Sequence, residues 1–208
     1  MTARSDARPR AWQRMLSGRR LDLLDPSPLD IEIEDIAHGL ARVARWNGQT
    51  HGDHAFSVAQ HSLLVDRIFG MVAGPVSADW LLMAFLHDAP EYVIGDMISP
   101  FKAVMGGAYK AVEARLQQAI HLRYGLPPAT PQKLKTIVKR ADGIAAYFEA
   151  TRLAGFEERE AAGFFGRPRG VGPDGLDLEP LPVHKVERQF LKRFAAIEAQ
   201  RSASDRKS

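Results

Sequence analysis

Four side chains of the kinds that bind metal ions follow one another along this chain in the order His, His-Asp, Asp. They are His61, His87, Asp88 and Asp142. His87 and Asp88 come directly after the apolar run 81–86 (LLMAFL), where burying an unpaired carboxylate would cost several kcal/mol. A dication would offset this cost, and imidazole with carboxylate ligands suits several divalent metals. We therefore predict that these four residues bind one divalent ion, Co²⁺, Mn²⁺, Zn²⁺, Fe²⁺ or Mg²⁺.

The first and last of these residues occur where a helix would bury them. His61 keeps helical spacing with Val58 and Val65, and Asp142 does so with Val138 and Ala145. A single inward histidine is more often a hydrogen-bonded core residue, and a single buried aspartate is usually a cap or an ion-pair partner. The joint pattern on three apolar faces favours a metal site. The other histidines lack this support; they are His38, His51, His54, His121 and His184. Of these, we expect the two in the 51–54 loop to be structural or solvent-exposed.

The elements that must position these residues are helical. Apolar periodicity and capping residues predict helices near 33–46, 58–72, 77–89, 108–124, 130–153 and 186–197. Pro90 should kink or restart the third helix just after the His-Asp pair, because proline removes a backbone donor. The alternating segment 20–25 (RLDLLD) is predicted to be a short strand or hairpin arm. The predicted fold class is all-α, a bundle of about six helices with a metal site in its core.

The chain divides into one core and several flanking segments. We predict an N-terminal basic segment or short arm over 1–30, a core over 31–155, a Gly/Pro-rich loop over 156–182, a helix over 183–200 and a basic tail over 201–208. The loop could form a lid over a pocket, although an insertion without a role is the more common case.

The composition is that of an ordinary globular protein of 208 residues, without cysteine and with a net charge of +3. Residues 1–20 carry +5 and residues 201–208 carry +2, so residues 21–200 carry −4. A nucleic-acid-binding domain would more often carry its basic charge on the folded part, so stable nucleic-acid binding is not expected. No run is apolar enough for a membrane span or a signal peptide, so we expect no membrane partner and a cytoplasmic location.

At this point the residues resemble those of the HD-domain metal-dependent phosphohydrolases, whose signature has the form H…HD…D. The closer resemblance is to the YfbR-like branch, the bacterial 5′-deoxynucleotidases. It covers roughly residues 30–155 and comprises motifs that occur in order. These are Arg45-Trp46, SVAQHSLLV (57–65), HDAPE (87–91), GDMISPFK (95–102) and RADGIAAY (140–147). Gln60 departs from the pattern, because an acidic residue commonly precedes the first histidine.

The resemblance implies hydrolysis of deoxyribonucleoside 5′-monophosphates to deoxynucleoside and phosphate, by a homodimer. Glu91 lies three residues after Asp88, which would place it beside the metal as a general acid or base. Arg45 could clamp two phosphate oxygens, and Asp96 could orient Arg45 or bind the 3′-hydroxyl. Trp46 could pack on the sugar and penalise a 2′-hydroxyl, as the resemblance implies. Lys102 could reach the phosphate, although a solvated lysine is more common.

Other functions remain open at this stage. A dNTP triphosphohydrolase would need more positive charge, which the basic residues of 133–140 could supply. Alarmone hydrolases carry an acidic pair after the HD motif, whereas this chain has Glu91-Tyr92, and the Gly-Tyr-Pro signature of cyclic dinucleotide phosphodiesterases is absent. A metal-stapled nucleotide sensor would need no turnover at all. Binding of nucleic acid through the basic tails is the weakest alternative.

Overall fold

A computed structural model describes residues 10–97 and 107–206 of the chain, and the fold over these residues is all-α, as predicted. The described part contains eight α-helices, two short 3-10 helices and one two-stranded hairpin. The α-helices are α1 (Ile33–Leu40), α2 (Val58–Ala73), α3 (Ala78–Phe85), α4 (Glu91–Ile94), α6 (Gly107–Arg123), α7 (Gln132–Arg152), α8 (Glu158–Phe165) and α9 (Val183–Asp205). The 3-10 helices are η1 (Pro28–Asp30) and η2 (Arg45–Gly48).

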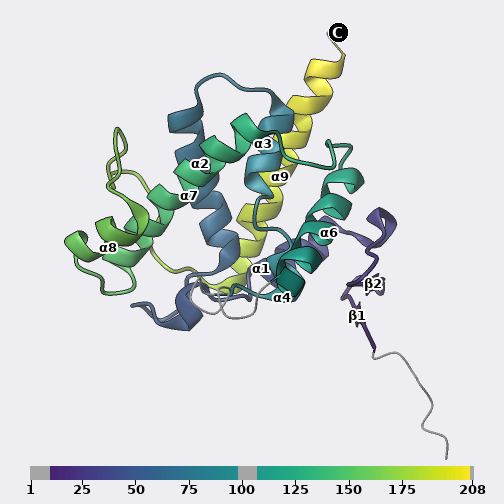
Figure 1. Ribbon diagram of the computed structural model, residues 1–208, viewed down its shortest axis with the longest axis horizontal. Coiled ribbons are helices and arrows are strands. Elements are labelled where there is room, and N and C mark those ends of the chain that lie inside the picture. The colour runs from purple at the N-terminus through teal and green to yellow at the C-terminus, as the bar shows by residue number, and fades with distance from the viewer. Residues whose placement is uncertain (1–9, 98–106, 207–208) are drawn as a thin grey trace, which may run out of the picture.

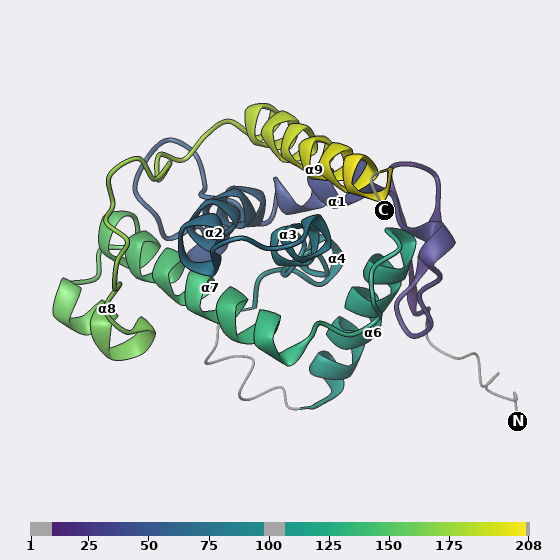
Figure 2. The ribbon, with the colours of Figure 1, turned by 90° about the horizontal axis from the view of Figure 1, so that it is seen from above.

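Helices α2 and α3 lie in the middle of the bundle, with α7, α9, α1 and α6 around them (Figure 2). Helix α2 packs mainly along α7, and α3 packs mainly along α9. Large side chains that are fully buried fill the space between the helices, among them Phe56, Phe69, Phe85 and Phe190. None of the helices in the described ranges is long and apolar enough to cross a membrane.

Serine caps set where α2 and α3 begin. The Ser57 hydroxyl accepts a bond from the Gln60 amide, and the Ser77 hydroxyl accepts one from the Trp80 amide. Each bond satisfies a donor that the first turn of a helix leaves without a partner. The cap at Ser57 places His61 in the first turn and a half of α2, on the face that meets α7.

The apolar helix α3 stops at Phe85, and a turn then carries the His-Asp pair. Pro90 is the N-cap residue of the short helix α4, which begins at Glu91, as the proline predicts. The Glu91 amide donates to the Asp88 carbonyl over 3.0 Å, so the turn that ends in α4 starts at the candidate ligand. His87, Asp88 and Glu91 therefore all lie in or next to the short turn between α3 and α4.

Besides the end of α3 at Phe85 rather than near residue 89, three boundaries differ from the sequence-based prediction. The range 156–182 is not loop throughout, because α8 forms over Glu158–Phe165, where acidic residues occupy the first turn. The last helix runs into the predicted basic tail and ends at Asp205. The first helix ends at Leu40 rather than near residue 46, because the backbone of the following turn leaves the helical region.

The N-terminal arm is a hairpin, in line with the prediction for 20–25. Strand β1 (Trp12–Arg14) pairs antiparallel with β2 (Arg20–Asp22), with Gln13 opposite Leu21. The hairpin lies at the opposite end of the molecule from α8 (Figure 1). It therefore stands apart from the candidate ligands on α2 and α7.

Candidate functional site

The structure brings the imidazoles of His61 and His87 together with the Asp88 carboxylate. One ligand atom from each of these residues lies within 4.8 Å of the others. The Nε2 atom of His61 lies 3.4 Å from Asp88 Oδ2, and the Nε2 atom of His87 lies 3.2 Å from the same oxygen. Both Nε2 atoms are buried without a hydrogen-bond partner among the described residues. Buried nitrogens converging on a carboxylate are the donor set that a divalent cation would satisfy.

Asp142 borders this group from helix α7. Its Oδ1 lies 3.2 Å from His61 Nε2, and 43% of its side chain is exposed. The sequence predicts a buried position, and the structure differs because this face of α7 passes the mouth of a pocket. Asp88 and Asp142 thus both approach His61 Nε2, whereas the ligand atoms that lie within 4.8 Å of one another belong to His61, His87 and Asp88.

The opposite nitrogen of each imidazole is occupied. His87 Nδ1 donates to the Ala84 carbonyl over 2.9 Å, and His61 Nδ1 lies 2.5 Å from Glu149 Oε1. A carbonyl can only accept, so the contact fixes the tautomer of His87 and leaves the lone pair on its Nε2. Partners of this kind orient imidazole ligands toward a metal ion.

Glu149 is the residue of the site that sequence reasoning missed. Its side chain is fully buried, and its second oxygen accepts bonds from Trp46 Nε1 at 2.9 Å and Arg45 Nε at 3.1 Å. One carboxylate thus links the His61 ring to both predicted substrate-binding residues. A signal existed, because Glu149 lies seven residues after Asp142, which puts both on one face of a helix.

The charges of this cluster hold one another ionised. Burial alone would raise the pKa of Glu149, but the Arg45 guanidinium and His61 lower it to about 2. Burial would lower the pKa of Arg45, but Glu149 and Asp96 raise it. Asp96 Oδ2 lies 3.1 Å from Arg45 Nη1, on the side of the guanidinium away from its Nε contact with Glu149. Arg45 is therefore held from two sides.

Trp46 adopts a backbone conformation that bulky residues rarely take. Its φ is 57° and its ψ is 27°, in the left-handed region. The bond to Glu149 and packing against Phe156 and Phe165, with ring centroids 5.6 and 5.8 Å away, hold the indole in place. Strain of this kind tends to persist where function requires a fixed geometry. Helix α8, which forms within the range predicted to be loop, supplies Phe165.

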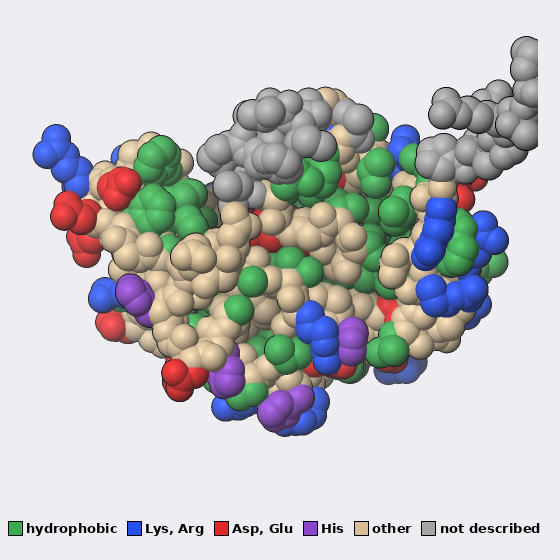
Figure 3. Space-filling view, turned by 90° about the horizontal axis from the view of Figure 1, so that it is seen from below, with side chains coloured by type: hydrophobic (Ala, Val, Ile, Leu, Met, Phe, Trp, Pro, Cys, Tyr) green, Lys and Arg blue, Asp and Glu red, His purple; other side chains and the backbone are tan. Residues whose placement is uncertain are grey.

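The remaining predicted residues fall into three groups. Glu91 is buried at the start of α4, one turn after Asp88. Lys102 lies outside the described residues. Of the other histidines, His121 is buried and bonds to the Pro127 carbonyl, His38 is partly exposed, and His51, His54 and His184 are exposed. Figure 3 shows histidine side chains on the surface of the face seen from below.

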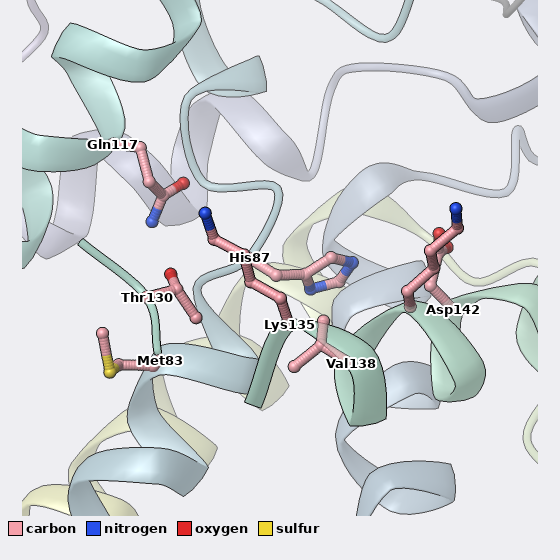
Figure 4. Close-up of a pocket in the computed structure, with 8 residues that line it drawn as sticks. Met83, His87, Gln117, Thr130, Lys135, Val138 and Asp142 are labelled. Carbon is pink, nitrogen blue, oxygen red and sulfur yellow. The ribbon is translucent and has the colours of Figure 1, made fainter. Parts of the chain in front are cut away.

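A pocket of about 270 Å³ opens beside His87 and Asp142 (Figure 4). Its polar lining includes Gln117 from α6, Thr130 from the connection before α7, and Lys135 and Lys139 from α7. Two of the four candidate ligands, His87 and Asp142, therefore line the pocket.

Comparison with known proteins identifies the family. The model of the family described as 5′-deoxynucleotidase YfbR-like matches residues 36–162. The chain belongs to this YfbR-like family. The match confirms the resemblance inferred from the sequence motifs, and its range includes the four candidate ligands, Glu149 and most of α8.

Two relatives of this YfbR-like chain match most of its length, and a third matches about half of it. An uncharacterised protein of Rhodobacter capsulatus is 56% identical over 90% of this chain and 96% of its own length. The uncharacterised protein YfdR of Escherichia coli is 35% identical over 79% of this chain and 83% of its own. The 5′-deoxynucleotidase YfbR of Shigella flexneri is 34% identical over 47% of this chain and 57% of its own.

Proposed function

We propose that this YfbR-like chain is a divalent-metal-dependent phosphohydrolase that converts deoxyribonucleoside 5′-monophosphates into deoxynucleoside and phosphate. Membership of the family supports a nucleotide phosphohydrolase. The observation that carries the proposal is the pair of buried Nε2 atoms of His61 and His87, aimed at the Asp88 carboxylate and lacking a hydrogen-bond partner among the described residues. A relative that shares part of the sequence bears the name 5′-deoxynucleotidase.

His61, His87, Asp88 and Asp142 would hold the ion. The ion supplies Lewis acidity, which activates water and withdraws charge from the phosphoryl group. The protein's part is to present two neutral imidazoles, and the contacts at both Nδ1 atoms keep the Nε2 atoms available. Which divalent metal binds would depend on the metals available as much as on this set of ligands.

Glu91 is the proposed general acid–base. It lies one turn after Asp88, so its carboxyl would lie close to a bound ion while Asp88 provides the ligand. In this role Glu91 accepts the proton of the attacking water and returns a proton to the departing 5′-oxygen. The Glu91 side chain is buried in the structure.

Arg45, Asp96 and Trp46 form the proposed substrate-binding side. Arg45 has 14% of its side chain exposed and is fixed by Asp96 and Glu149, so it offers an oriented guanidinium edge to the phosphate. Trp46 is locked by Glu149 and α8, so its indole cannot yield to a larger sugar. A rigid wall at this place would penalise the 2′-hydroxyl of a ribonucleotide.

The test is phosphate release from the full chain. The protein is stripped with chelator, one metal at a time is restored, and deoxyribonucleoside and ribonucleoside monophosphates are supplied. We expect orthophosphate from the deoxyribonucleotides, a loss of about 100-fold or more in Glu91→Gln, and wild-type rates in the exposed control Glu34→Gln. In Trp46→Ala, the ratio of the rate with deoxyribonucleoside monophosphates to the rate with ribonucleoside monophosphates should be smaller than in the wild type. If metal binds at the site and no metal supports release, the protein is not this enzyme.

A further inference from the structure

The pocket beside the metal-binding group has features that hydrolysis of a monophosphate does not use. Its volume of about 270 Å³ is just below the range of roughly 300–1,000 Å³ that encloses a complete small ligand. It therefore suits one part of a ligand whose remainder lies at the metal. His87 belongs to the metal-binding group and also lines the pocket, and Asp142 lines the pocket while its Oδ1 lies 3.2 Å from His61 Nε2. A molecule bound at the ion could therefore extend into the pocket.

Two lysines give this pocket its charge. Lys135 and Lys139 are four residues apart on α7, and Asp142 follows three residues later on the same face. Both lysines are exposed, and neither forms an ion pair with any residue in the described ranges. Two like charges at this spacing repel each other, so an anion between them would relieve the repulsion. Figure 4 shows Lys135 and His87 at the same opening.

The cation beside the metal-binding group is already engaged by carboxylates. Four carboxylates lie around His61 and Arg45; they are Asp88, Asp96, Asp142 and Glu149. Arg45 already bonds to two of them. Within the described lining of the pocket, Lys135 and Lys139 are the positive side chains that no carboxylate neutralises.

The side chains that line the pocket indicate which part of a nucleotide, base, sugar or phosphate, would bind there. A base would stack on aromatic rings, and the only ring in the described lining is the His87 imidazole. A sugar would need no pair of ammonium groups. A phosphate group with about two negative charges matches two lysines, and the Thr130 hydroxyl can add a hydrogen bond.

We infer that this pocket is a second phosphate subsite, and that the chain also accepts deoxyribonucleoside 5′-diphosphates. The inference rests on the proposed function for the position of the first phosphate. The sugar-linked phosphate lies at the metal, and the outer phosphate lies between Lys135 and Lys139. Water forms a bond to the sugar-linked phosphorus, and the bond from that phosphorus to the 5′-oxygen breaks. The 5′-oxygen takes a proton, so the products are deoxynucleoside and pyrophosphate.

The first experiment measures binding and needs no turnover. Pyrophosphate and orthophosphate are titrated calorimetrically into the full chain, with the divalent metal in excess over the anion so that chelation leaves the protein loaded. We expect pyrophosphate to bind at least about tenfold more tightly. The double variant Lys135→Gln/Lys139→Gln should lose this preference. The control Lys133→Gln, which removes an exposed α7 lysine outside the pocket lining, should keep it.

The second experiment compares substrates. Deoxyribonucleoside mono- and diphosphates are assayed with the same variants, and pyrophosphate and orthophosphate are quantified separately. We expect pyrophosphate from the diphosphate, and a rise of about tenfold in its KM relative to that of the monophosphate in the double variant. A rise that is equal for both substrates would show that the lysines serve the first phosphate and would overturn the second subsite. So would orthophosphate as the only product from the diphosphate.

The two proposals fail in different ways. A preference for pyrophosphate that depends on the lysines, without hydrolysis of any monophosphate, would leave the subsite standing and remove the proposed enzyme activity. Hydrolysis of monophosphates with equal binding of both anions would do the reverse. A double variant that loses helical signal is replaced by the single variants, each of which should show part of the loss.

Discussion

Glu149 Oε1 lies 2.5 Å from His61 Nδ1, across the contact between helices α7 and α2. Neither side chain has any exposed surface. A buried carboxylate that orients an imidazole in this way typically accounts for a factor of 10 to 100 in metal affinity. Glu149 thus connects the buried side of α7 to the ring of the candidate ligand His61.

The first prediction concerns that contact. Glu149→Gln keeps the volume and removes the charge, so metal affinity should fall about 10- to 100-fold because His61 is no longer held as a ligand. The dissociation constant of the metal, measured by calorimetry on the full chain, checks this. The exposed control Glu160→Gln should bind metal like the wild type. Equal affinities in the two variants would show that Glu149 does not act on the ion.

The second prediction concerns Arg45. Arg45→Met leaves Asp96 and the buried Glu149 without their cation, and breaking one side of a buried pair costs about 3–5 kcal/mol. Arg42 is a matched control, because its bond to Glu187 lies at the surface and such pairs contribute about 0–1 kcal/mol. Urea unfolding of the two variants measures the difference. The free energy of unfolding should fall much more in Arg45→Met than in Arg42→Met.

A double-mutant cycle locates the cost in the pair. Adding Glu149→Gln to Arg45→Met should recover part of the lost stability, because the buried charge that needed the guanidinium is gone. Strict additivity of the two substitutions would contradict this account of the cluster.

The third prediction concerns the packing of α1 on α4. A Cβ at Gly39 would lie 2.7 Å from the Tyr92 carbonyl oxygen and 2.8 Å from Tyr92 Cβ. Gly39→Ala should therefore destabilise the protein by about 1–3 kcal/mol through overpacking, against a gain in helix propensity of about 1 kcal/mol. Gly70→Ala in α2 meets nothing within 4 Å and should stabilise it. Because α4 begins at Glu91, turnover should also fall in Gly39→Ala.

Thermal unfolding and phosphate release on the two alanine variants provide the measurement. A Gly39→Ala protein as stable and as active as Gly70→Ala would show that α1 and α4 can separate at little cost. The position of Glu91 would then not depend on this contact.

The fourth prediction concerns pH. Burial lowers the pKa of His121 below its ordinary value of 6.5, although the backbone carbonyls of Pro127 and Pro128 oppose this. Above pH 6.5 the His121 ring is neutral in both the folded protein and the unfolded chain. As the pH falls below 6.5 the unfolded chain takes up the proton first, so stability declines until the pH passes the folded pKa.

Urea unfolding between pH 7.5 and pH 5 checks this effect on metal-free protein. The decline of unfolding free energy with falling pH should be smaller in His121→Asn than in the wild type. The exposed control His184→Gln should retain the wild-type decline. A decline that is unchanged in His121→Asn would assign it to other groups.

The sequence by itself determined the features that depend on neighbouring residues. Helical periodicity placed His61 on an inward face, and Pro90 predicted the restart that presents Asp88 near Glu91. The same periodicity predicted a buried Asp142, which the structure leaves partly exposed. These features follow from backbone geometry over a few residues, so a linear pattern contains them. The acidic first turn of α8 was such a pattern too, but the glycines and prolines after it led to a loop prediction.

Tertiary structure decided what lies across the bundle. The contact between His61 and Glu149 joins residues 88 positions apart, and Arg45 meets Glu149 across 104 positions. No local pattern carries such a distance, because it depends on how α2 and α7 pack. The strained Trp46 backbone and the pocket at Lys135 are likewise products of packing. The sequence therefore indicated the candidate ligands. The hydrogen-bond partners that orient these ligands, and the pocket beside them, depend on how the helices pack and are visible only in the tertiary structure.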